Sequence, residues 1–141
     1  MNTTMTMQAD SYPMGLRYLI ILGTLGAFAT GIPAVFLPTL VVALTGLSAE
    51  AIPAMQQAGA ITIGFGVGGV FCLRAANWNE VRITVIASLA SFALTTVGAF
   101  YYVVLQGVAT PGLILILVVA VVMTLGYGYY VWHYAQRGEV M

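Results

Sequence analysis

Long apolar segments alternate with short polar turns along the chain, and this pattern predicts membrane-spanning helices. A hydrocarbon core about 30 Å thick requires about 20 apolar residues in a helix. The segments that we expect to span the membrane are residues 16–36, 51–73, 80–105 and 111–134. Residues 1–15 and 136–141 are expected to form tails. The pattern predicts an all-α polytopic membrane protein whose four transmembrane helices form one antiparallel bundle.

The first apolar segment is too long for a single helix. No charged residue occurs in residues 18–49, and two prolines, Pro33 and Pro38, interrupt this stretch. Because proline removes a backbone donor and disturbs a helix interior, we expect the first helix to end near Phe36. Residues 37–47 are too few to cross the bilayer, and they are predicted to form a break followed by an interfacial or re-entrant turn.

Short polar motifs mark the starts of the other helices. Ser48 offers a hydroxyl oxygen that could cap the second helix. Asn77 and Glu80 have the spacing of a capping box, in which two side chains satisfy free backbone donors before the third helix. Thr110 followed by Pro111 provides a cap and then a proline at the first position of the fourth helix.

Composition places the chain in a bilayer and excludes several classes of function. Hydrophobic residues make up 61% and charged residues 6% of the chain, and the mean hydropathy is +1.01. Soluble proteins carry about 25% charged residues. The single cysteine, Cys72, allows no intrachain disulfide and no cysteine-rich metal cluster. Four arginines without any lysine form no basic patch, so we expect the lipid bilayer and not nucleic acid as a partner.

The arginines predict how the chain is oriented. With the helices as predicted, one side of the membrane receives Arg17, Arg74, Arg82 and Arg137. The loops on the opposite side carry only Glu50 as a charge. Since Lys and Arg near helix ends are retained in the cytoplasm, both termini are expected to be cytoplasmic. We accordingly expect a multi-pass protein of the inner (cytoplasmic) membrane.

Small residues recur at every fourth position of the predicted helices and predict close helix packing. In lipid, helices associate through close backbone contact and interhelical hydrogen bonds, because no hydrophobic force joins them. The residues expected at these contacts are Gly23, Ala27, Gly31, Ala60, Gly64, Gly68, Ser91, Thr95, Thr124 and Gly128. Residues 64–69 also match a dinucleotide-binding pattern, but that motif requires a βαβ unit and these glycines lie inside a predicted span.

Few residues offer chemistry within the predicted spans. No Asp, Glu, Lys or His lies at mid-span, where ionisable groups usually mark ion or substrate paths. Neither paired carboxylates nor a nucleophile beside a base can be found, so we do not expect an enzyme. The candidates for binding an apolar cofactor, itself unknown, are Gln56, Gln57 and His133. We favour packing hydrogen bonds for the glutamines and a place in an interfacial aromatic belt for His133.

The order of several short motifs resembles a known group of bacterial membrane proteins. Leu16-Arg17-Tyr18 enters the first helix, Phe36-Leu37-Pro38 follows it, and Leu47-Ser48 precedes a glycine-rich second helix that ends at Arg74. In this layout, over residues 16–135, the chain resembles the DoxX-like and related four-helix membrane proteins. The resemblance implies a bundle with both termini inside and an accessory role, since some relatives resemble subunits of membrane oxidoreductases. It supplies no catalytic motif.

Three functions therefore remain open. The favoured one is a structural or accessory protein, either a packing or partner subunit of a membrane complex or a homo-oligomer, because small-residue faces are abundant and chemistry is scarce. The second is a membrane module that binds an apolar cofactor such as a quinone, a haem or a pigment. The third is a transporter of a small neutral or lipidic solute.

Overall fold

The computed structural model describes residues 12–138, and within them the chain is helical with no β-strand. The α-helices are α1 (Met14–Phe36), α2 (Pro38–Thr45), α3 (Ile52–Arg74), α4 (Trp78–Phe100) and α5 (Pro111–Gln136). A 3₁₀ turn (Ala49–Ala51) precedes α3, and a π-helical turn (Tyr101–Leu105) follows α4. Four of the described helices, α1, α3, α4 and α5, are long and apolar enough to cross a membrane. The prediction of an all-α, multi-pass membrane protein is confirmed at this level.

The segment between α1 and α3 contains a helix where we expected a break and a turn. The break falls at Leu37, whose backbone leaves the helical region with φ −130° and ψ 49°. Pro38 then occupies the first position of α2, where its missing N–H costs nothing. Gly46 ends α2 with φ 74°, a left-handed conformation that glycine adopts without strain. Residues 38–45 therefore form two helical turns.

Two of the three predicted helix caps form. The Oδ1 atom of Asn77 accepts a hydrogen bond from the backbone N–H of Glu80 at 3.3 Å, and the Glu80 carboxylate accepts one from the backbone N–H of Ala76 at 2.9 Å. The Thr110 hydroxyl oxygen accepts from the N–H of Leu113. The Ser48 side chain makes no capping hydrogen bond, because the chain enters α3 through the 3₁₀ turn instead.

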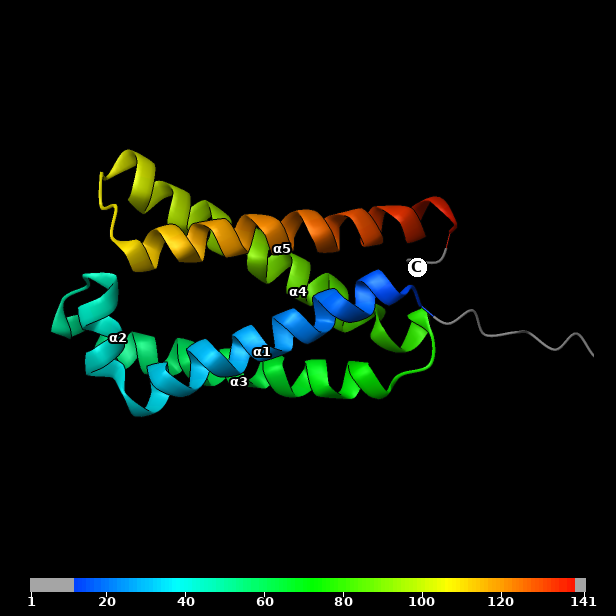
Figure 1. Ribbon diagram of the computed structural model, residues 1–141, viewed down its shortest axis with the longest axis horizontal. Helices are drawn as coiled ribbons and strands as arrows, with labels where there is room; N and C mark the ends of the chain where they lie inside the picture. Colours follow the sequence, from blue (N-terminus) through cyan, green and yellow to red (C-terminus); the bar gives the residue numbers. More distant parts are fainter. Residues whose placement is uncertain (1–11, 139–141) are drawn as a thin grey trace, which may run out of the picture.

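The four long helices run in alternating directions but pack as two pairs and not as one even bundle. Helix α1 packs mainly against α3, and α4 packs mainly against α5 (Figure 1). The connection from α3 to α4 leads from the first pair to the second. The predicted antiparallel bundle is thus divided into an α1–α3 pair and an α4–α5 pair, which touch chiefly at their ends.

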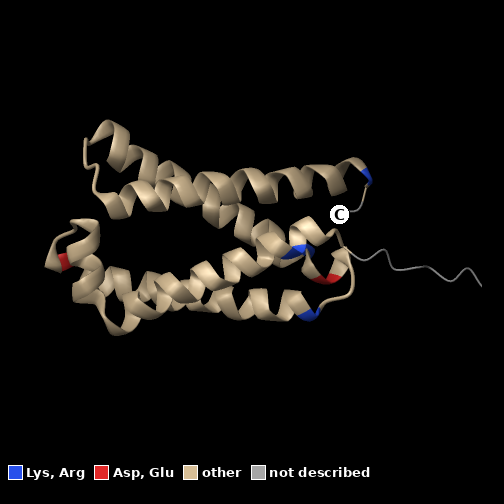
Figure 2. Cartoon of the chain, viewed as in Figure 1, with Lys and Arg blue, Asp and Glu red and all other residues tan. Residues whose placement is uncertain are grey.

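The pairs meet most closely at one end, which holds Arg17, Arg74 and Arg82 and is called the arginine end below (Figure 2). There, Leu16 and Val81 are fully buried. Around them lies a cluster drawn from all four long helices, whose other members include Ile20, Cys72, Trp78, Val85, Met123, Tyr127 and Tyr134. This cluster holds the two pairs together.

Polar and aromatic contacts reinforce the arginine end. The Tyr12 hydroxyl donates to the carbonyl oxygen of Cys72 at 2.8 Å, and the Arg17 guanidinium donates to that of Leu73 at 3.0 Å. Burial raises the pKa of the Tyr12 phenol, which Arg17 partly opposes, so the phenol remains a donor at neutral pH. The rings of Trp78 and Tyr134 stack with their centroids 4.0 Å apart. These contacts join α4 to α5, and they join the residue before α1 and the first turn of α1 to the end of α3.

The pairs also touch at the opposite end, through α2. The Thr110 hydroxyl donates to the carbonyl oxygen of Thr45 at 3.1 Å. A Cβ atom added to Gly112 would lie 2.9 Å from the carbonyl oxygen of Leu44, so the start of α5 runs against the backbone of α2. With contacts at both ends, the space between the pairs remains open in the middle.

Candidate functional site

A cleft of about 910 Å³ lies between the α1–α3 pair and the α4–α5 pair. Residues from all four long helices line it, so that it occupies the middle of the membrane-spanning region. Sites for small molecules in proteins usually measure about 300–1,000 Å³ and are lined mainly by apolar side chains with a few polar groups. The cleft has the size and composition of such a site.

Small residues on the α1 face explain why the cleft stays open. The α1 residues that line it include Gly26, Ala27 and Ala29, which have little or no side chain. A Cβ atom added to Gly26 would meet nothing within 4 Å. Since the pairs are held apart by contacts at both ends, side chains this short cannot fill the space between them.

The cleft opens sideways, between α1 and α5. Leu22 and Leu25 of α1 and Leu115 and Val118 of α5 line it and are themselves more than half exposed. In a bilayer, such exposed apolar side chains face acyl chains. A molecule dissolved in the bilayer could therefore reach the cleft without crossing the headgroup layer.

Hydroxyl groups are the main polar feature of the cleft. Those that line it belong to Thr24, Thr30, Thr62, Thr84, Ser88, Ser91, Thr95 and Tyr127. Several are already engaged: Thr24 donates to the carbonyl oxygen of Ile20 at 2.7 Å, and Thr62 donates to that of Ala58 at 2.8 Å. Such bonds to the preceding helical turn are common for threonine in helices.

No Asp, Glu, Lys, Arg or His is among the described residues that line the cleft. Most of the described charged residues lie instead at the arginine end of the chain, and Glu50 lies at the opposite end near α2 (Figure 2). No group of three His, Cys, Asp or Glu residues that could hold a metal ion occurs within residues 12–138. The described residues that line the cleft therefore carry no formal charge, and their polar side-chain groups are hydroxyls and the Cys72 thiol.

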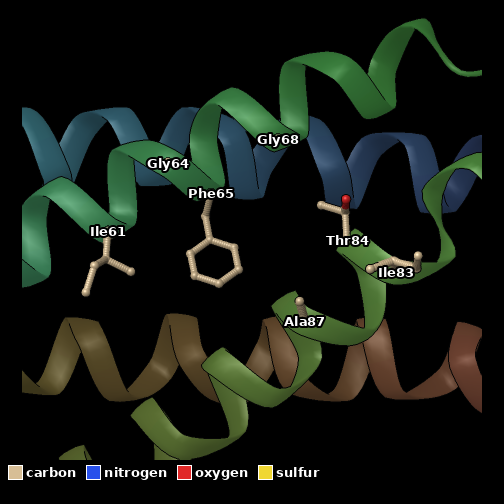
Figure 3. A pocket seen from close by; sticks show the side chains of 7 residues that line it. All are labelled: Ile61, Gly64, Phe65, Gly68, Ile83, Thr84 and Ala87. Carbon is tan, nitrogen blue, oxygen red and sulfur yellow. The ribbon is translucent and has the colours of Figure 1, made fainter.

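A smaller hollow of about 310 Å³ adjoins the cleft between α3 and α4 (Figure 3). It is lined by Ile61, Gly64, Phe65, Gly68, Ile83, Thr84 and Ala87. Phe65 and Thr84 line both spaces. In Figure 3 the Phe65 ring projects from α3 across the gap between the helices, and Thr84 and Ala87 stand on α4. The hollow and the cleft therefore adjoin each other at Phe65 and Thr84.

The close contact between α1 and α3 lies one residue away from the row of small residues predicted for α3. Gly31 faces Gly59: a Cβ atom added to Gly31 would lie 2.9 Å from the carbonyl oxygen of Gly59, and the reverse distance is also 2.9 Å. Ala60 is exposed, and a Cβ atom at Gly64 would meet nothing within 4 Å. The predicted contacts at Ala60 and Gly64 are therefore not made, because this face of α3 turns away from α1.

The other predicted packing residues divide into two groups. Ala27, Ser91 and Thr95 line the cleft and do not form a tight helix contact. The remaining residues lie next to a neighbouring helix: Gly23, which also lines the cleft, against Tyr127, Gly68 near Thr84, Thr124 against Thr96 and Gly128 near Leu89. The hydroxyl oxygens of Thr124 and Thr96 lie 3.3 Å apart, and this contact connects α5 to α4.

The three candidates for binding a cofactor lie outside the cleft. The Gln56 side chain donates to the carbonyl oxygen of Val35 at 3.1 Å, which is a packing bond between α3 and α1 of the kind expected. Gln57 is exposed near the start of α3. The centroid of the His133 ring lies 6.1 Å from that of Tyr129 and 5.8 Å from that of Tyr134, near the end of α5.

Sequence reasoning did not identify the residues that form the cleft. One available signal was a row of hydroxyl residues at helical spacing on α4, Thr84, Ser88, Ser91 and Thr95. This row indicates a polar stripe within a span, yet only the placement of the two pairs reveals that it faces an open space. No protein-family model, curated protein or solved structure matches the chain.

Proposed function

We propose that the protein binds an apolar or amphipathic molecule, taken from the bilayer, in the cleft between its two helix pairs. The observation that carries the proposal is the cleft itself, which is ligand-sized, neutral, lined with hydroxyls and open toward lipid. Of the three functions left open by the sequence, this is closest to a module that binds an apolar cofactor. The DoxX-like resemblance, the accessory role and a role in transport stay predictions.

The proposed site differs from the one suggested by the sequence. Its ligand would contact small residues of α1 and hydroxyls of α4, not Gln56, Gln57 or His133. A haem or pigment held by His133 is not favoured, because that side chain stands among tyrosines outside the cleft. The ligand class supported best is therefore a lipid-like molecule without a metal.

Filling the cleft is expected to abolish this binding. In nanodiscs, a long alkyl chain bearing a mid-chain diazirine should label residues that line the cleft. Gly26→Trp places a large ring in the open space at Gly26, and labelling of cleft residues such as Phe92 and Met123 should be lost. Peptide mass spectrometry after illumination measures the labelled positions.

Gly98→Trp is the matched control, because Gly98 is also helical, exposed and without a neighbour within 4 Å, but does not line the cleft. This variant should keep the labelling of the wild type. Equal labelling of the cleft in Gly26→Trp and in the wild type would show that the probe does not enter the proposed site.

We also propose that both termini are cytoplasmic and that the protein lies in an inner membrane. Support comes from Arg17, Arg74, Arg82 and Arg137, which lie at or near helix ends on one side, opposite Glu50. In a Cys72→Ala background, an impermeant thiol reagent added to intact cells should label Thr110→Cys and spare Gly138→Cys. Labelling of Gly138→Cys alone would show that the chain has the opposite orientation.

A further inference from the structure

We propose that the molecule bound in the cleft carries an uncharged oxygen acceptor, such as a ketone or ester carbonyl, which receives hydrogen bonds from Thr84 and Ser88. This inference rests on the proposed function and deepens it by naming the ligand chemistry. Three observations support it: which hydroxyls already donate a hydrogen bond, how deep they lie in the membrane, and the absence of charged side chains among the described lining residues.

Seven of the eight cleft hydroxyls fall into two chemical groups, and the eighth, that of Tyr127, donates to the carbonyl oxygen of Leu19 in α1. Those of Thr24, Thr30, Thr62 and Thr95 donate their protons to carbonyl oxygens of their own helices. Among the described residues 12–138, the hydroxyls of Thr84, Ser88 and Ser91 make no such bond. A hydroxyl that donates to its own helix can only accept from a ligand, whereas an uncommitted hydroxyl can donate. Donor capacity in the cleft is therefore concentrated on α4.

The uncommitted hydroxyls share one face of α4. Residues 84, 88 and 91 follow the spacing i, i+4 and i+7, which places them in a row along a helix. All three line the cleft and are half-buried. A single ligand group in the cleft could therefore meet two neighbouring hydroxyls, Thr84 and Ser88, one turn apart.

The depth of this row limits the ligand. At 1.5 Å per residue, Thr84 and Ser91 lie about 9 and about 20 Å along α4 from Trp78. In a hydrocarbon core about 30 Å thick, Ser88 and Ser91 lie well below the headgroups, whereas Thr84 stands two residues beyond Arg82 and nearer the arginine end. A polar group of the ligand that reaches Ser88 must therefore be one that is tolerated within the hydrocarbon core.

Charge further narrows the ligand chemistry. An ionised group at this depth is costly without a partner of opposite charge, and the described cleft residues include no Asp, Glu, Lys, Arg or His. An uncharged acceptor needs only a donor, and in an apolar cleft a donor left without a partner is itself unfavourable. A neutral carbonyl on an apolar chain fits both the donors and the walls of the cleft.

The test compares two competitors of the alkyl diazirine probe in nanodiscs, a long-chain ketone and the alkane of equal chain length. The ketone should displace the probe at about three- to tenfold lower mole fraction than the alkane, the factor expected for a net neutral hydrogen bond. Thr84→Val and Ser88→Ala should each remove most of this preference while leaving displacement by the alkane unchanged. Thr84→Ser, which keeps the hydroxyl, should retain the preference for the ketone.

Thr62→Val provides the matched control, because Thr62 also lines the cleft but donates to Ala58. This variant should keep the preference for the ketone. Equal displacement by ketone and alkane in the wild type, with labelling still abolished by Gly26→Trp, would overturn this inference and leave the proposed function standing. Labelling that persists in Gly26→Trp would overturn both.

Discussion

Replacing Gly59 with leucine is expected to force α1 away from α3 and to destabilise the folded protein. A Cβ atom at Gly59 would lie 2.7 Å from the Cβ atom of Ala34 and 2.9 Å from the carbonyl oxygen of Gly31. The second of these neighbours is backbone, which cannot move aside without displacing the whole helix. Overpacking a tight contact typically costs 1–3 kcal/mol, and we expect about 3 kcal/mol here. Titration with SDS, followed by tryptophan fluorescence, measures the free energy of unfolding.

Gly64→Leu is the control for this prediction. Gly64 lies on the same helix, was predicted from the sequence to be a packing residue, and has open space around it. Leucine favours helix over glycine by roughly 1 kcal/mol, so this variant should match or slightly exceed the stability of the wild type. Similar losses in both variants would mean that α3 does not meet α1 through the face that carries Gly59.

Trp78→Ala is expected to detach the α4–α5 pair from the α1–α3 pair. Trp78 is only 3% exposed, stacks on Tyr134 and belongs to the cluster that joins the pairs at the arginine end. Truncating a buried tryptophan typically costs about 3–5 kcal/mol through lost contacts and the cavity that remains. The apparent Tm, measured by gel filtration after heating, should fall by roughly 10 °C or more.

The second tryptophan of the chain gives the comparison. Trp132 lies on α5 and is 59% exposed. Trp132→Ala should therefore change the apparent Tm by much less, because its ring faces the surroundings and not the protein interior. A Tm that falls equally in both variants would contradict the claim that the pairs are joined by the cluster around Trp78.

Features governed by neighbouring residues could be predicted from the sequence. The long apolar segments predicted the four spanning helices, and the spacing of Asn77 and Glu80 and the position of Thr110 predicted two caps that form. The contact of Gln56 with Val35 was predicted as a packing hydrogen bond, though without its partner. Each of these features depends on residues close in sequence or on a general cost of leaving polar groups unpaired in lipid.

Features that depend on how the helices are placed could not be predicted. Small residues occur on several faces of α3, including both Gly59 and Gly64, so a repeat of four does not select the face that meets α1. Whether four helices pack evenly or as two pairs depends on contacts between residues far apart in sequence, such as Trp78 with Tyr134 and Thr45 with Thr110. The cleft follows from that division, so no local pattern could reveal it.

Native mass spectrometry of protein released gently from its own membrane tests most directly whether the cleft holds a molecule from the bilayer. We predict that the wild type and Gly98→Trp carry an added small mass, that Gly26→Trp has lost it, and that fragmentation identifies a neutral, carbonyl-bearing apolar molecule. An added mass retained by Gly26→Trp, or no added mass on the wild type, would contradict the account.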